Sequence, residues 1–166
     1  SEKDLRIINN CLINSFSLFR NLIDIDTLFI HEPPIFEKKQ NKELISNIFK
    51  LLSNFKTNNN FKNIGIAGEN VFLYREFFNL GLIDVVQTSL SNLIKTEDSD
   101  LKFCLDNCRN LNLYGTHKVE NANLSLKLNN IFEKIDRIPN LSIIISTTNS
   151  KKLSSRLKEA MKIIPK

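Results

Sequence analysis

Short apolar segments alternate with helical repeats along the whole chain, and this alternation restricts its fold more than any other feature. The apolar segments end near His31, Gly68, Gln87, Tyr114 and Ser146. Between them, leucine, isoleucine and phenylalanine recur three or four residues apart, which is the period of an amphipathic helix. Strands that alternate with helices form parallel sheets through right-handed crossovers. The sequence therefore predicts an α/β fold with five parallel strands and six helices.

Six segments carry the helical repeat. They are residues 1–22, 40–56, 71–80, 98–109, 121–137 and 150–163. Gly81 directly follows the third, where a glycine commonly ends a helix. Cys104 and Cys108 are four residues apart, a spacing that places both on one face of a helix and that is not typical of metal or redox sites. We expect them to be reduced core residues.

Length and composition indicate a single domain over residues 1–166. The chain is 42% hydrophobic and 25% charged, which is sufficient for one core. It has no run of eighteen apolar residues and no apolar segment near Ser1 that would act as a signal peptide. We therefore expect a cytoplasmic protein that does not bind a membrane.

The net charge of +5 arises in the last sixteen residues, which hold six lysine or arginine residues and one glutamate. The first 150 residues are neutral overall. Nucleic-acid-binding proteins spread basic side chains over a face with interleaved aromatic residues, whereas the aromatic residues here occupy apolar positions. We expect no nucleic-acid partner. The basic segment indicates either a local anion site or a solvated helix face.

Two α/β architectures fit the alternation. A doubly wound sheet commonly carries a G-x-G-x-x-G turn, and Gly65-Ile66-Ala67-Gly68 lacks that spacing. A barrel places polar side chains at the carboxyl ends of its strands, where we predict His31, Gln87, Tyr114 and Thr147. The pattern favours a barrel. Eight strands need about 250 residues, so this chain lacks about three strand–helix units.

Several segments resemble the aldo-keto reductases in order and spacing. The similar segments are IDTLFIHEPP at residues 25–34, IGIAG at 64–68, DVVQ at 84–87, LY at 113–114 and STTNSKKLSSRL at 146–157. The resemblance covers the last five strands of that family. It implies a (β/α) TIM barrel of the aldo-keto reductase type, present here as an incomplete barrel of five strands.

The resemblance also implies site residues and a cofactor. His31 matches the histidine that orients and polarises the substrate carbonyl, Gln87 the residue that holds the nicotinamide carboxamide, and Tyr114 the residue that stacks on the nicotinamide ring. The adenosine phosphate end is assigned to Thr147, Thr148, Asn149, Lys151, Lys152 and Arg156. Lysines in a first helical turn oppose the helix dipole, so we expect them to contact a 2′-phosphate and the cofactor to be NADP in preference to NAD.

The chain departs from the family in two places. Ala67 and Gly68 stand where the family has a serine and an asparagine that bind the nicotinamide amide. The family's proton-donor tyrosine, with its lysine and aspartate, comes from three strands that have no counterpart here. The resemblance thus implies part of an NAD(P)H-dependent reductase of a small carbonyl substrate, and a chain that is inactive alone. A start without methionine and within a helix fits a fragment of a longer reductase.

Two other functions fit the sequence. One is a non-catalytic binding or structural protein of the same type, whose open sheet edges predict self-association. The other is a phosphate-binding barrel enzyme such as an aldolase or isomerase. That chemistry needs a lysine or a pair of carboxylates at the strand ends, and the sequence suggests neither.

Overall fold

The computed structural model describes residues 2–19, 24–33, 39–58, 61–115, 129–130, 133, 140–145 and 150–161. The strands are β1 (Thr27–His31), β2 (Asn63–Ala67), β3 (Val85–Ser89), β4 (Asn110–Tyr114) and β5 (Asn140–Ile143). The helices are α1 (Glu2–Phe19), α2 (Lys39–Thr57), the 3-10 helix η1 (Val71–Tyr74), α3 (Arg75–Asn79), α4 (Leu90–Lys95), α5 (Asp98–Asn107) and α7 (Ser150–Met161). Within these ranges, no helix has the length and apolar character needed to cross a membrane.

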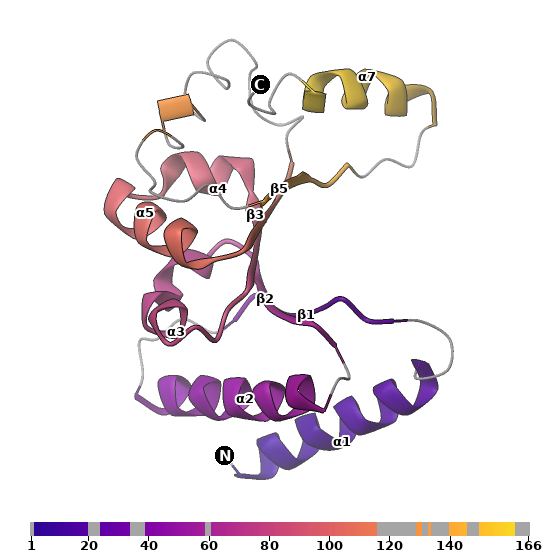
Figure 1. Cartoon of the computed structure of the whole chain (residues 1–166), viewed down its shortest axis with the longest axis vertical. Coiled ribbons are helices and arrows are strands. Elements are labelled where there is room, and N and C mark those ends of the chain that lie inside the picture. Colours follow the sequence, from indigo (N-terminus) through magenta and orange to yellow (C-terminus); the bar gives the residue numbers. More distant parts are fainter. Residues whose placement is uncertain are drawn as a thin grey trace.

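The five strands form one parallel sheet in the order β1-β2-β3-β4-β5, which confirms the predicted α/β class and parallel pairing. Each strand therefore lies beside the strand that follows it in the chain. This order contains no point of reversal, which a doubly wound sheet requires. Right-handed crossovers between successive strands place the connecting helices on one face. Figure 1 shows α2, α3, α4 and α5 along the same side of the sheet.

The sheet face that meets the helices is apolar. Ile30, Ile66, Val86 and Leu111 are register partners on adjacent strands, so their side chains share this face. Helices α2, α4 and α5 cover it with side chains that are almost fully buried. These are Phe49, Leu52, Leu90, Leu93, Leu101 and Leu105. Full burial of one such side chain stabilises the fold by roughly 1.5–3 kcal/mol, so this apolar layer is the main source of stability.

The opposite face is mixed in character. Phe29, Gly65, Val85 and Asn110 form one row of register partners on it. A Cβ atom at Gly65 would lie 2.4 Å from the Phe29 ring. Only glycine at this position leaves room for the ring to lie across β2.

Several local predictions are confirmed. Gly81 has a φ of 65° and follows α3 in a Schellman turn, in which Gly81 N–H donates to the Phe78 carbonyl and Leu82 N–H to the Phe77 carbonyl. Cys104 and Cys108 are buried and unbridged. The predicted helix over 121–137 lies largely outside the described residues.

The structure adds two features to the sequence prediction. Strand β3 begins at Val85, because the residues before it complete the turn after α3. Helix α4 was not predicted, since six residues are too few to display a helical repeat. Its start is fixed by the Ser89 hydroxyl, which accepts a hydrogen bond of 3.0 Å from Asn92 N–H.

Asp84 connects three strands and a helix at the amino ends of the strands. Its buried carboxylate accepts a hydrogen bond from Ile64 N–H at 2.9 Å and pairs with the Lys56 ammonium at 2.5 Å. Its backbone carbonyl accepts from Arg109 N–H at 2.8 Å, and the Arg109 guanidinium lies 3.7 Å from the carboxylate. Asp84 therefore joins β2, β3, β4 and α2.

We predict that Asp84→Ala lowers the free energy of unfolding by about 3 kcal/mol, because it leaves the Ile64 N–H and a half-buried lysine without their acceptor. Urea denaturation followed by circular dichroism measures this loss. The matched control is Glu76→Ala, which removes an exposed carboxylate paired with Lys42 and should cost less than about 1 kcal/mol. Equal losses in the two variants would contradict a special role for Asp84.

Candidate functional site

The strands all end at one edge of the sheet, which we call the carboxyl edge. His31 is the last residue of β1 and Tyr114 the last residue of β4. Gln87 was predicted to end its strand, but β3 continues to Ser89, so that prediction is wrong by two residues. His31 pairs with Ala67, and Ala67 pairs with Gln87. His31 and Gln87 are therefore level with each other, two strands and roughly 10 Å apart.

His31, Gln87 and Tyr114 also share a face of the sheet. Register partners point the same way, and side chains two residues apart on a strand do so too. Gln87 is two residues from Ser89, and Ser89 pairs with Tyr114. The shared face is the mixed one, opposite the helices. His31 is exposed, whereas Gln87 and Tyr114 are half-buried.

Glu69 is the centre of a hydrogen-bonded cluster at this edge. It follows β2 by two residues, and its carboxylate accepts hydrogen bonds of 3.2 Å from the Tyr114 hydroxyl and from the Ser89 hydroxyl. Its backbone carbonyl accepts a 2.7 Å hydrogen bond from the Asn92 side-chain amide. One residue thus links the carboxyl ends of β2, β3 and β4 to the first turn of α4.

Asn92 and Thr88 hold the backbone beneath this cluster. The Asn92 amide also donates to the Thr88 hydroxyl at 2.8 Å, and that hydroxyl donates to the Gly68 carbonyl at 2.9 Å. Thr88 is fully buried. A chain of hydrogen bonds between side chains therefore fixes the backbone at Gly68 and Glu69.

Glu32 brings a second carboxylate to the same place. It has a φ of 44°, a left-handed conformation that is uncommon for a residue other than glycine. Glu32 N–H donates to the Ala67 carbonyl at 2.7 Å, which extends the β1–β2 ladder by one residue. A Cβ atom at Gly68, whose φ is 132°, would lie 2.6 Å from the Glu32 carboxylate. The side chain of Glu32 therefore turns back over β2.

The cluster makes Tyr114 a weaker acid. Burial, the negative charge of Glu69, the hydrogen bond to Glu69 and the charge of Glu32 together raise the pKa of Tyr114 to about 12. All four effects favour the neutral phenol. Tyr114 is thus a hydrogen-bond donor held in one orientation and a poor source of protons near pH 7.

The predicted phosphate-binding residues are described only in part. Thr147, Thr148 and Asn149 lie outside the described residues. Lys151, Lys152 and Arg156 belong to α7, in which Lys152 is exposed and the side chains of the other two lie outside the description. The helix that was predicted to begin beside these basic residues is confirmed from Ser150 onward.

Sequence reasoning missed Glu32 and Glu69. It found no pair of carboxylates at the strand ends, yet these two residues follow successive strands and approach the same phenol. Both resemble solvated turn residues in the sequence. The available signal was their position, directly after the apolar segments ending at His31 and Gly68. No group of three or more metal-ligating side chains occurs among the described residues.

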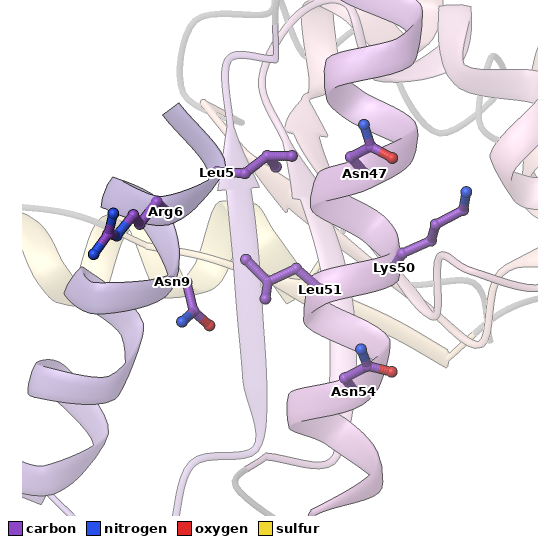
Figure 2. Close-up of a pocket in the computed structure, with 7 residues that line it drawn as sticks. All are labelled: Leu5, Arg6, Asn9, Asn47, Lys50, Leu51 and Asn54. Carbon is purple, nitrogen blue, oxygen red and sulfur yellow. The ribbon is translucent and has the colours of Figure 1, made fainter. Parts of the chain in front are cut away.

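A separate groove lies between α1 and α2 (Figure 2), and none of the predicted site residues lines it. Its volume is about 540 Å³, and it is lined by Leu5, Arg6, Asn9, Asn47, Lys50, Leu51 and Asn54. In Figure 2 Leu5 points toward α2 and Leu51 toward α1, whereas Arg6 and Lys50 point away from the space between the helices. Its charged groups therefore do not converge on a ligand.

We predict that Glu69→Gln lowers the pKa of Tyr114 from about 12 part of the way toward 10, since burial remains while the carboxylate charge is removed. The chain has two tyrosines and no tryptophan, so a Tyr74→Phe background isolates the Tyr114 phenolate absorbance. This absorbance is recorded immediately after rapid pH jumps, before the protein unfolds at alkaline pH. The control is Asp106→Asn, a carboxylate in the last turn of α5, which should leave the titration unchanged. An unchanged pKa in Glu69→Gln would show that the hydrogen bond is not formed.

Comparisons of the chain with protein-family models, with curated proteins and with solved structures found no match. The fold and the site are therefore characterised by their own geometry: a five-stranded parallel α/β sheet whose carboxyl edge gathers a histidine, a glutamine, a tyrosine and two glutamates.

Proposed function

We propose that the carboxyl edge is the nicotinamide and substrate end of an NAD(P)H-dependent carbonyl reductase of the aldo-keto reductase type, of which this chain supplies a part. The sheet would then be an arc of a (β/α) barrel. One observation carries the proposal: His31, Gln87 and Tyr114 lie at one edge and on one face of a parallel sheet whose strands follow chain order. Barrel enzymes place their chemistry at this edge.

The three side chains suit a flat ring that bears an amide. Tyr114 offers an aromatic face and is fixed by its hydrogen bond to Glu69. Gln87, on the adjacent strand, offers an amide that can both donate and accept. His31 is exposed two strands away, where its imidazole can donate a hydrogen bond to a carbonyl oxygen. When bound, the nicotinamide supplies the hydride; the protein binds and orients.

The described carboxyl edge lacks the lysine-paired tyrosine that the resemblance to the aldo-keto reductases assigns as the proton donor. It contains no lysine, and Tyr114 is held neutral by Glu69 and Glu32. Reduction also requires a proton for the oxygen of the product alcohol. The proposal therefore assigns binding and orientation to this chain and proton donation to strands of the longer reductase.

The cofactor is proposed to be NADP, with NAD bound more weakly. The support is the charge of α7, whose first two turns contain Lys151, Lys152 and Arg156 and no acidic residue. Phosphates bind well at the start of a helix near cationic side chains. The substrate is proposed to be a small carbonyl compound.

We predict that NADPH binds more tightly than NADH. The double variant Lys151→Ala/Arg156→Ala should reduce the affinity for NADPH about tenfold and change the affinity for NADH little. The reason is that it removes positive charge only from the position opposite the 2′-phosphate. Fluorescence titration of both cofactors measures this. The matched control, Lys50→Ala/Lys95→Ala, removes two exposed lysines from other helices and should change neither affinity. Equal affinities for the two cofactors would exclude a 2′-phosphate site.

We further predict that the 166-residue chain does not reduce aldehydes at a measurable rate, since it lacks a positioned proton donor. The oxidation of NADPH in the presence of an aldehyde, followed by absorbance, tests this. Turnover that disappears in His31→Ala would show that this chain contains a complete active site. If instead neither cofactor bound, the alternative of a non-catalytic barrel-like protein would be favoured.

A further inference from the structure

The carboxyl edge is acidic in the described part of the chain, although the proposed cofactor is an anion. Glu32 and Glu69 both lie there, and no described residue of that edge is a lysine or arginine. The basic residues are on α7 instead. The two ends of the proposed cofactor site therefore have opposite charge.

Hydrogen bonds fix the carboxylate of Glu69, and the carboxylate of Glu32 lies over Gly68. Glu69 accepts from Tyr114 and Ser89, and its backbone is held by Asn92. Glu32 turns back over Gly68, where any side chain would collide with its carboxylate. Both charges act on the phenol of Tyr114, as its raised pKa indicates. A ring stacked on Tyr114 would lie in the same negative field.

This field distinguishes the two redox states of a nicotinamide. The oxidised ring carries one positive charge and the reduced ring carries none, while the phosphates are the same in both. A carboxylate several ångströms from the ring attracts the oxidised form and does little to the reduced form. Where the family has a serine and an asparagine that bind the nicotinamide amide, this chain has Ala67 and Gly68. The side chains here therefore add no amide contacts to the effect of the Glu69 charge on the ring.

We propose that Glu69, assisted by Glu32, makes this site selective for the oxidised, cationic nicotinamide, so that NADP⁺ binds more tightly than NADPH and hydride transfer from the bound cofactor to the carbonyl is favoured. This inference rests on the proposed function. Glu69 is a positioning and charge-selecting residue, because it acts through the Tyr114 ring and the field at the edge and does not react.

The test compares the affinities of the full chain for NADP⁺ and NADPH by isothermal titration calorimetry at pH 8. The ratio of the two affinities cancels the contribution of the phosphates and of α7. We expect NADP⁺ to bind about fivefold more tightly than NADPH. Glu69→Gln, which keeps an oxygen acceptor for the tyrosine, should bring the ratio close to one, and Glu32→Gln should reduce it by a smaller factor.

Asp106→Asn is the matched control, because this carboxylate is in the last turn of α5, which leads into β4, and so lies at the amino edge of the sheet. It should leave the ratio unchanged. Circular dichroism checks that each variant is folded. Binding of both cofactors with equal affinity, or the same ratio in Glu69→Gln as in the natural chain, overturns this inference alone. Failure of both cofactors to bind overturns the proposed function and this inference with it.

Discussion

The arrangement of the carboxyl edge depends on a carboxylate at the opposite edge. Asp84 binds the backbone of β2 through its side chain and the backbone leading into β4 through its carbonyl oxygen. These contacts fix the register of three adjacent strands. A slip of one residue in a strand would move all of its side chains to the other face. The common face of Gln87 and Tyr114 is thus set by a residue that contacts neither of them.

Features that arise from local sequence could be predicted. The strands and the turn at Gly81 follow from apolar periodicity and from the conformational freedom of one glycine. The buried state of Cys104 follows from its place in the helical repeat of α5. In each case a segment of a few residues contains the full physical cause, so no knowledge of distant parts of the chain was needed.

Features that depend on contacts between distant segments could not be predicted from the sequence. The interaction of Glu69 with Tyr114 joins residues 45 positions apart, and that of Asp84 with Lys56 joins residues 28 apart. Glutamates in turns are usually solvated, so nothing in the sequence separated Glu69 from other turn residues. The end of β3 was misplaced for a related reason: Gln87 looked like a terminal polar residue, while Thr88 is buried by its bonds to Gly68 and Asn92.

The strand order has a consequence for synthesis of the chain on the ribosome. Each described strand after β1 pairs with the strand before it, so β1 and β2 can pair completely before β3 emerges. No strand must wait for a later one to be inserted between it and its neighbour, and contacts close in sequence form quickly. The described strands can be added to the sheet in the order of translation, and each new strand and helix extends the existing layer without disturbing the pairs already made.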